Sequence, residues 1–243
     1  AGLQSCSAPV YTGEYAFRET LAGRHMDPQF WLERWDNNQI GFHQGEINTH
    51  LQRYWPQLAL PSRGHVFVPL AGKTLDMLWL AGQGHRVTGI EVSERAVRDF
   101  FEENGLTPEI REEDEFRIFQ AEEIQLIQGD YFDLVPADLG PVDAVFDRAS
   151  LIALPPAMRP DYARQLQLLA RACPVLLVTL DYDQREMQGP PFAVGADEIE
   201  GLYGSSHRIT PLDGLDVLAE HPRFRARGLT RLEERVYRLD PRA

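Results

Sequence analysis

A glycine turn and a glutamate nineteen residues after it have a spacing that predicts chemistry. Gly72 stands between an apolar segment, 66–68, and a segment of helical composition, 74–81, and Glu91 ends a second apolar segment, 86–91. A glycine turn that leads into a helix lets a ligand approach the backbone near the positive end of the helix. An acid at the end of the next strand can accept hydrogen bonds from the ribose hydroxyls of an adenosine cofactor. The spacing therefore predicts a nucleoside cofactor site.

One β-α-β unit is needed to bring these two residues together. The β-branched and aromatic run 66–68 indicates a short buried strand, which Pro69 ends, and Gly82 and Gly84 end the helix that follows. The crossover between two such strands is right-handed, so the strands are parallel and their carboxyl ends lie at the same edge of the sheet. The alternative is a β-α-β unit with a purely structural role.

The glycine content of the turn distinguishes between classes of cofactor. A P-loop requires a first glycine where this chain has Phe67, although Gly72-Lys73-Thr74 fits the end of that motif. A dinucleotide-binding turn has the pattern G-x-G-x-x-G, and a single glycine stands here. We therefore expect no hydrolysis of nucleoside triphosphates. A single glycine suits a cofactor without a pyrophosphate, such as S-adenosylmethionine (AdoMet).

Composition and charge limit the class of protein. The 243 residues, 43% hydrophobic and 25% charged, suit one large α/β domain. A net charge of −13 without a basic block argues against nucleic acid or an anionic membrane as a partner. No apolar run approaches the ~20 residues that span a bilayer, so we expect a cytoplasmic protein, with a monomer as the default state. Cys6 and Cys173 fit neither a disulfide framework nor a metal site, so we expect no metal and a buried Cys173.

Residues 1–25 differ from the rest of the chain. They lack helical or strand periodicity and run into Arg24-His25-Met26. His-Met ahead of a plausible start is typical of a cloning site, which predicts a vector-derived leader followed by a single domain over 26–243. The alternative is a genuine disordered extension.

Aromatic residues gather ahead of the first strand. Asp27 as the N-cap and Pro28 at the first helical position predict a helix that carries Phe30, Trp31 and Trp35. These rings form either a core stripe or the wall of a ligand pocket. Asn, Gln and His residues follow them closely in the sequence, and both interpretations stay open.

Further patterns predict the remaining elements. The acidic segment 108–115 is expected to be a solvated loop, and Leu166, Leu168 and Leu169 are expected to form the core side of their helix. We expect later strands over 116–119, 124–128, 142–146, 175–180 and 232–239, and helices over 48–55, 94–104, 159–172, 195–203 and 213–220.

Three positions after later strands are candidates for ligand binding. Asp130 follows the strand 124–128 and is placed to bind the edge of an adenine ring, or to cap a helix. Arg148 lies at the carboxyl end of a strand, where open α/β sheets bind ligands. Its alternative role is a salt bridge with Asp147 or Asp143. The rigid turn 189–192, Gly-Pro-Pro-Phe, is expected over the strand ends as a substrate lid.

The ordered combination of these segments resembles the thiopurine S-methyltransferase family, a group of class I AdoMet-dependent methyltransferases. The resemblance covers nearly everything from Phe30 to Leu239 and is similar to the shorter bacterial members. The segments that carry it are Trp31-x-x-x-Trp35, Gly41-Phe42-His43-Gln44, Val68 to Lys73, Gly89 to Ser93, Phe132-Asp133-Leu134, Asp147 to Leu151, Tyr182-Asp183 and Gly189 to Phe192.

The resemblance implies an α/β, Rossmann-like fold with a seven-stranded, mixed and mostly parallel sheet flanked by helices. It implies AdoMet as cofactor and S-adenosylhomocysteine as product. Phe42 matches a residue at the junction of cofactor and substrate, and Arg148 and Arg223 match catalytic arginines near the substrate. Asp130-Tyr131 stands where animal members have a smaller Ser-Ile type pair. The implied cofactor-binding residues are Trp31, Trp35, Leu70, Gly72, Glu91, Asp130, Tyr131 and Arg148.

Methyl transfer from a sulfonium to a thiolate needs little proton chemistry, which agrees with a sequence that shows no Ser-His-Asp pattern. A guanidinium near the sulfur favours the thiolate, so we predict that Arg148→Ala lowers turnover far more than fold stability. His43 and His207 are either bases or structural residues. Three functions stay open: S-methylation of small aromatic or heterocyclic thiols, methylation of inorganic selenium or tellurium species, and a catalytically inactive protein that binds a nucleoside cofactor.

Overall fold

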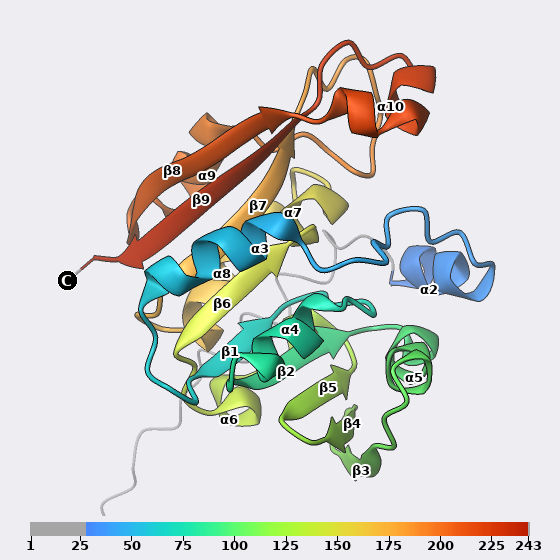
Figure 1. Cartoon of the computed structure of the whole chain (residues 1–243), viewed down its shortest axis with the longest axis vertical. Helices are drawn as coiled ribbons and strands as arrows, with labels where there is room; N and C mark the ends of the chain where they lie inside the picture. Colours follow the sequence, from blue (N-terminus) through green and yellow to red (C-terminus); the bar gives the residue numbers. More distant parts are fainter. Residues whose placement is uncertain (1–27, 243) are drawn as a thin grey trace, which may run out of the picture.

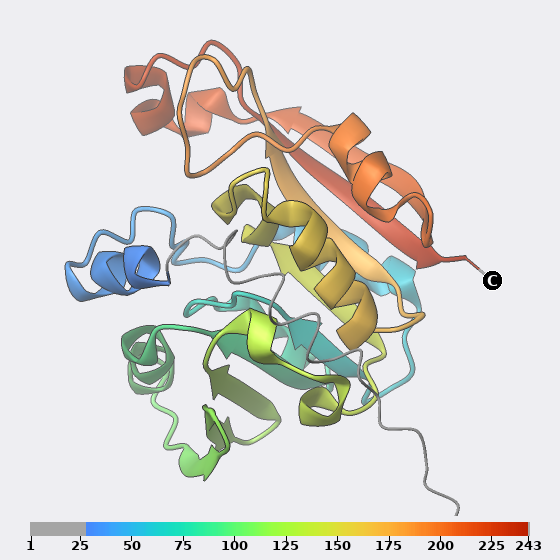
Figure 2. The same cartoon turned by 180° about the vertical axis from the view of Figure 1, so that it is seen from behind.

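The computed structural model describes residues 28–242, which contain one mixed sheet with helices on both faces (Figures 1 and 2). The predicted leader, residues 1–25, and the predicted cap Asp27 lie outside the described residues. The strands are β1 (His65–Val68), β2 (Arg86–Glu91), β3 (Glu109–Glu113), β4 (Phe116–Ala121), β5 (Ile124–Gln128), β6 (Ala144–Arg148), β7 (Val175–Asp181), β8 (His207–Asp216) and β9 (Glu233–Pro241).

Short helices connect the strands. The α-helices are α2 (Gln29–Asp36), α3 (Thr49–Tyr54), α4 (Asp76–Gly82), α5 (Glu94–Glu103), α6 (Pro136–Leu139), α7 (Ser150–Ala153), α8 (Arg159–Leu169), α9 (Ala196–Tyr203) and α10 (Pro222–Ala226). Three 3-10 turns complete the elements: η1 (Trp55–Leu58), η2 (Tyr131–Asp133) and η3 (Leu218–Glu220). Polar side chains cap two of these helices, because those of Asn48 and Ser93 accept hydrogen bonds from Leu51 N and Ala96 N.

The strand order is β3-β4-β5-β2-β1-β6-β7-β9-β8. The five strands from β5 to β7 in this order are parallel, while β3, β4, β8 and β9 pair antiparallel at the two sides. This arrangement confirms the predicted α/β, Rossmann-like class. The predicted count of seven strands is wrong, because the sheet has nine, and β3 and β8 are the two that the sequence analysis missed.

The two missed strands have a common physical cause. All five residues of β3 are exposed, and the strand is held by its antiparallel register with β4, in which Ile110 faces Phe119. The segment 108–115 is therefore not a loop. β8 runs through Asp216 and pairs along its whole length with β9, so the helix predicted over 213–220 is wrong. Backbone pairing with another strand decides the structure in both places.

Alternation along the strands divides the core into two layers. Val66 and Val68 on β1 pack in the cluster that includes side chains from α3, α4 and α5. Phe67 between them packs in the opposite cluster, with side chains from α8 and α9. Of the leucines predicted to face the core from α8, Leu166 and Leu169 are buried, whereas Leu168 is exposed. The parallel strands sandwiched between these layers present their carboxyl ends along one edge.

Candidate active site

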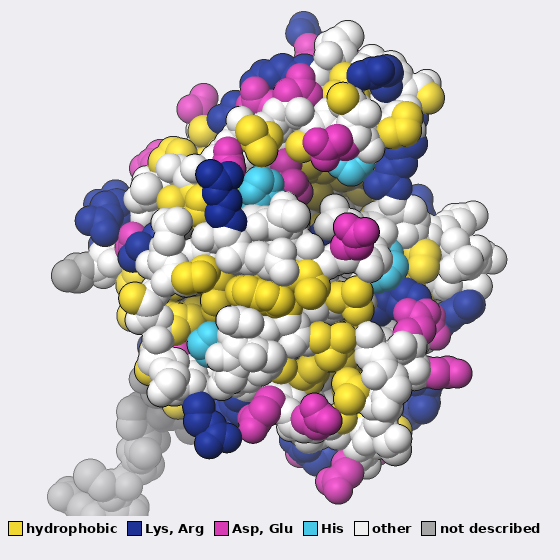
Figure 3. Space-filling view, in the orientation of Figure 1, with side chains coloured by type: hydrophobic (Ala, Val, Ile, Leu, Met, Phe, Trp, Pro, Cys, Tyr) yellow, Lys and Arg dark blue, Asp and Glu magenta, His cyan; other side chains and the backbone are white. Residues whose placement is uncertain are grey.

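A cavity of about 520 Å³ opens at the carboxyl ends of β1, β2, β6 and β7. The segment after α2, residues 39–44, the turn 189–191 and α10 complete its rim. Figure 3 shows a recess with hydrophobic side chains below α10, bordered by Lys and Arg side chains. The predicted site residues that line this cavity are Trp31, Trp35, Phe42, Leu70, Gly72, Glu91, Arg148 and Arg223.

Glu91 joins the two strand ends of the β-α-β unit. Its Oε2 accepts a hydrogen bond from the backbone N–H of Gly72 at 2.9 Å, and its Oε1 accepts one from Ser93 N at 2.9 Å. Burial raises the pKa of Glu91, and the backbone N–H groups of Ser93 and Gly72 oppose this rise because they stabilise the carboxylate. The side chain is therefore held in one orientation at the cavity wall.

The glycine turn has an unusual backbone. Leu70 has φ of +45° and Gly72 has φ of +54°. The left-handed region costs a residue with a side chain about 1–2 kcal/mol, so strain is concentrated in a segment that lines the cavity. A Cβ at Gly72 would lie 3.2 Å from the ring of Trp35, which shows how closely that ring approaches the turn.

Three rings form one wall of the cavity. Phe42 makes edge-on contacts with Trp31 and Trp35, with ring centroids 5.5 Å apart in both pairs. Trp35 is buried, while Phe42 is 39% exposed. The three rings line the cavity and do not belong to the core clusters of the described residues. Of the two interpretations of the predicted aromatic group, the pocket wall therefore holds for Trp31 and Trp35, whereas Phe30 does not line the cavity.

Arg148 is fixed by three side chains that come from other elements. Its Nε donates to Asp76 Oδ2 at 2.8 Å, its Nη2 to Thr74 Oγ1 at 3.0 Å and its Nη1 to Gln44 Oε1 at 3.1 Å. Asp76 is fully buried, and its Oδ1 also accepts from Asn48 N at 2.8 Å. A buried carboxylate needs such a partner. The network ties β6, the start of α4 and the rim segment together behind the cavity.

The partner of Arg148 is thus neither Asp147 nor Asp143, the two candidates from the sequence. Successive residues of a strand face opposite sides of a sheet. Asp147 accordingly points into the core, where Tyr162 donates its hydroxyl hydrogen to Oδ2 at 2.8 Å. Burial raises the pKa of Asp147 to about 6, and hydrogen bonds from Tyr162 and Ser150 act in the opposite direction.

Asp130 and Tyr131 do not line the cavity. Asp130 caps η2, because its Oδ1 accepts a hydrogen bond from Phe132 N at 2.9 Å, so the capping alternative is the one observed. Tyr131 is buried in the core, where it stacks on Tyr162 and donates its hydroxyl hydrogen to the Tyr162 carbonyl at 3.1 Å. Their contact with a cofactor stays a prediction that rests on the resemblance.

Among the polar residues of the cavity that were missed as site residues, four lie in or beside the network of Arg148. They are Lys73, Thr74 and Asp76, which follow the glycine turn directly, and Gln44 in the rim segment. The Lys73 amine donates to Glu103 Oε1 at 2.6 Å and so ties the turn to α5. The polar residues just after Gly72 could have been predicted as site residues from their place beside the glycine turn. Their hydrogen-bond partners on other elements could not be predicted from the sequence.

Arg223 reaches the rim segment from α10. Its Nη1 lies 3.0 Å from the point where a Cβ of Gly41 would stand. Burial, followed by the charge of Arg227, lowers the pKa of Arg223. Burial and then the charge of Lys73 lower the pKa of His43, which favours a neutral imidazole beside the cavity. His207 does not line the cavity, and its Nδ1 lies 2.8 Å from Ser206 Oγ.

The turn predicted as a lid forms the wall opposite the rim segment, through residues 189–191. The Tyr182 hydroxyl donates to the carbonyl of Pro191 at 2.6 Å, and Phe192 N donates to Ile152 O at 2.7 Å. These bonds hold the turn over the carboxyl ends of the strands. Within residues 28–242, no helix has the length and the apolar character needed to cross a bilayer.

Comparison with known proteins shows which family has this site. A thiopurine S-methyltransferase from Pseudomonas fluorescens is 53% identical over 214 residues, which are 88% of this chain and 99% of that protein. One from Azotobacter vinelandii is 48% identical over 218 residues, 89% of this chain and 100% of that protein.

Solved structures support the fold. The 1,6-didemethyltoxoflavin-N1-methyltransferase of Burkholderia thailandensis, solved with bound S-adenosylhomocysteine, matches with a TM-score of 0.58 at 17% identity, over 97% of this chain and 93% of that one. A SAM-dependent methyltransferase from Anabaena variabilis matches with a TM-score of 0.58 at 13% identity, over 90% and 96%. The model of the thiopurine S-methyltransferase family matches residues 26–242, and the chain belongs to this family.

Proposed function

We propose that the protein transfers the methyl group of AdoMet to the sulfur of small aromatic or heterocyclic thiols and leaves S-adenosylhomocysteine. The observation that carries the proposal is the meeting of Glu91, the aromatic wall and Arg148 in one cavity at the carboxyl ends of parallel strands. The relatives named as thiopurine S-methyltransferases, about half identical over nearly their whole length, support the same reaction. A cytoplasmic, monomeric enzyme is part of the proposal.

The chemistry of the lining residues fits AdoMet. Each carboxylate oxygen of Glu91 accepts one backbone hydrogen bond and retains a second lone pair for a ribose hydroxyl. Gly72 has no side chain between the turn and the cavity, so the methionine part of the cofactor can approach the backbone of the turn closely. Leu70 and Trp35 would enclose the cofactor from two sides.

When bound, AdoMet supplies an electrophilic methyl group on a positively charged sulfonium. Trp31, Trp35 and Phe42 present ring faces and edges to the cavity, and an aromatic face stabilises a nearby cation by ~0.5–2 kcal/mol. The positive charges of Arg148 and Arg223 favour the thiolate form of a bound thiol. The rim segment and the turn 189–191 would align the reactants and exclude water.

Calorimetric titration of the protein with AdoMet and with S-adenosylhomocysteine tests the cofactor site. We expect micromolar binding of both compounds and a loss of at least roughly tenfold in affinity for Glu91→Ala, about 1.4 kcal/mol. Glu91→Gln is the matched control for size, because it keeps the shape but cannot accept as many hydrogen bonds. Absence of binding to the unmodified protein would reject the methyltransferase proposal.

Turnover then identifies the acceptor. The protein saturated with AdoMet is assayed with aromatic thiols and, in parallel, with selenite and tellurite. Methylation of the thiols supports the proposal. Methylation of selenium or tellurium species alone would favour the second function considered from the sequence, and binding of AdoMet without any turnover would favour the inactive binding protein.

A further inference from the structure

Five lysine and arginine residues line the cavity, and two of them form ion pairs with carboxylates. Lys73 pairs with Glu103, and Arg148 pairs with Asp76. The Arg34 guanidinium lies over the ring of Phe30, 3.4 Å from its centroid. The Arg223 guanidinium lies over the ring of Phe224, 4.8 Å from its centroid, and Arg227 is the fifth of these residues.

Arg223 and Arg227 lie four positions apart at the end of α10, where Arg227 N donates to the Arg223 carbonyl at 3.2 Å. Among residues 28–242, neither guanidinium forms an ion pair with a carboxylate. Like charges at this spacing destabilise a helix. The arrangement therefore has an unfavourable electrostatic energy that a bound anion would relieve.

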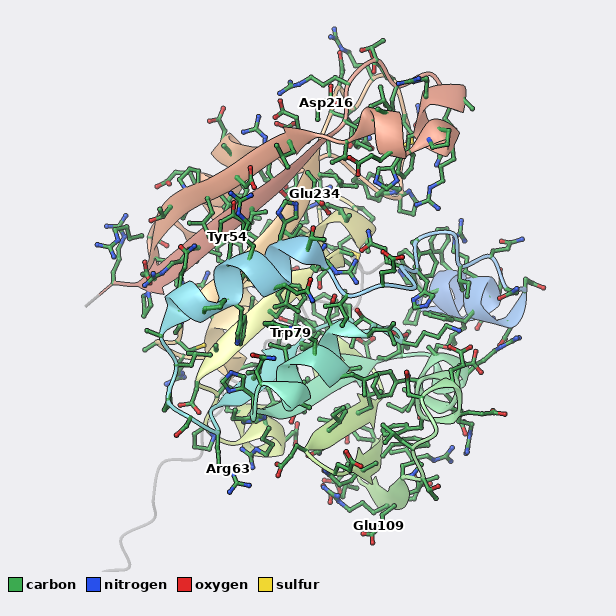
Figure 4. The ribbon with its side chains drawn as sticks, in the orientation of Figure 1. Tyr54, Arg63, Trp79, Glu109, Asp216 and Glu234 are labelled. Carbon is green, nitrogen blue, oxygen red and sulfur yellow. The ribbon has the colours of Figure 1, made fainter. Side chains whose placement is uncertain are left out.

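The acidic residues of the cavity cannot supply that anion, because each is already engaged. Asp76 binds Arg148, and Glu91 binds two backbone N–H groups. Glu234 on β9, labelled in Figure 4, has its Oε2 3.0 Å from His50 Nε2. The only imidazole on the same short element as the two arginines, within the described part of the chain, is His221, which contacts the ring of Phe224.

Both arginines line the cavity, and they are close enough that, besides burial, the charge of Arg227 lowers the pKa of Arg223. Arg223 contacts the rim segment at Gly41. Burial raises the pKa of Tyr182, and the charge of the nearby Arg227 opposes that rise. Tyr182 in turn donates its hydroxyl hydrogen to the carbonyl of Pro191, in the turn 189–191 that lines the same cavity. Figure 3 shows Lys and Arg side chains beside the recess below α10.

We propose that Arg227, with Arg223 beside it, binds a carboxylate of the thiol substrate and so determines specificity for aromatic thiols with an acidic substituent. This inference rests on the proposed function and names the substrate class of the same site. Arginine binds carboxylates through two parallel hydrogen bonds. A local cationic pair is also needed because the chain as a whole, with a net charge of −13, repels anions.

The test compares two thiols that differ only in the acid. Methylation of 4-mercaptobenzoate and of thiophenol is measured for the unmodified protein, Arg227→Gln and Arg225→Gln. Arg225 is the matched control, because it lies on the same helix but does not line the cavity. We expect Arg227→Gln to lower the ratio of kcat/KM for 4-mercaptobenzoate to that for thiophenol by roughly tenfold, through KM. Arg225→Gln should leave this ratio within about twofold.

Two results would overturn the inference. One is an equal loss for both thiols in Arg227→Gln. The other is a weaker calorimetric Kd for AdoMet in this variant with an unchanged thiol ratio, which would assign the guanidinium to the carboxylate of the cofactor. If the unmodified protein methylates neither thiol, the proposed function fails, and calorimetry with 4-(methylthio)benzoate tests the subsite alone. Weaker binding in Arg227→Gln than in Arg225→Gln supports it, and equal binding overturns it.

Discussion

A buried carboxylate lies on each side of β6, and the two have different surroundings. On the cavity side, Asp76 is fully buried but faces the guanidinium of Arg148 and accepts two further hydrogen bonds, from Asn48 N and from the hydroxyl of Thr74. On the core side, Asp147 is equally buried among tyrosines and has no cation beside it. The residues that separate the two environments, Asp147 and Arg148, are neighbours in the chain.

The difference shows what burial alone does to a charge. Burial of Asp147 raises its pKa to about 6. The folded protein therefore loses part of its stability when this carboxyl ionises. The carboxylate of Asp76 lies in a complete set of donors, which holds Arg148 in place before any ligand arrives. We infer that the cavity side stabilises the ionised carboxylate of Asp76, whereas ionisation of Asp147 on the core side lowers the stability of the fold.

The largest effect is expected from breaking the cavity side. Arg148→Ala leaves the Asp76 carboxylate buried without a cation, so the free energy of unfolding should fall by about 3–5 kcal/mol. Turnover should fall by roughly 100-fold, because a charge directed at the reacting sulfur is lost. Urea denaturation and a methyl-transfer assay measure the two quantities. The sequence analysis expected turnover to fall far more than stability, and the buried partner changes that prediction.

A double variant separates structure from catalysis. Arg148→Ala with Asp76→Asn removes the unpaired charge, so most of the lost stability should return while turnover stays low. Full turnover in the single variant, or recovery of turnover together with stability in the double variant, would contradict a direct role of Arg148 in the reaction.

Local sequence patterns predicted the β-α-β unit and most of the cavity wall. Gly72 and Glu91 could be placed because a turn, a helix and a strand end lie within one short segment, and their hydrogen bond at 2.9 Å shows that they meet. The parallel strands also brought Arg148 to the predicted edge. Sequence reasoning succeeded where neighbouring residues decide the geometry.

Contacts between distant segments could not be predicted in the same way. Arg148 and Asp76 are 72 residues apart, and neither position shows a pattern that links them. Strand alternation does exclude Asp147 as a partner of Arg148, a step that the sequence alone allowed. β3 is exposed and charged, so it has no apolar alternation, and its pairing with β4 is the reason for its extended form.

The core side gives the second prediction, which concerns pH. The pKa of Asp147 in the folded protein, about 6, exceeds its ordinary value of 3.8, so the folded state binds the proton more tightly. The contribution of Asp147 to the free energy of unfolding should therefore fall as the pH rises from about 4 to 6, by up to about 3 kcal/mol at 1.36 kcal/mol per pKa unit. Asp147→Asn removes this contribution. The stability of this variant relative to the unmodified protein should therefore be higher at pH 8 than at pH 4.

Urea denaturation across this pH range compares the two proteins. Tyr162→Phe provides the opposite change, because it removes the hydroxyl that donates to Asp147 Oδ2 and should make the fall steeper. Asp147→Asn and the unmodified protein should differ in their free energy of unfolding by different amounts at pH 4 and at pH 8. An equal difference at both pH values would contradict the assignment of this pH dependence to Asp147.

The smallest effect sharpens the comparison at the rim of the cavity. Gln44→Ala removes the acceptor of Arg148 Nη1 but leaves the bonds to Asp76 and Thr74. This bond joins a charged guanidinium to a neutral amide at the partly solvated rim and should contribute about 0.5–1.5 kcal/mol, so KM should rise roughly threefold to tenfold while the midpoint of urea denaturation hardly moves. Gln44→Glu keeps an acceptor and should retain the original KM. An unchanged KM in Gln44→Ala would show that the ring contacts of Phe42 alone hold the rim segment, and that the buried side of the network suffices to orient Arg148.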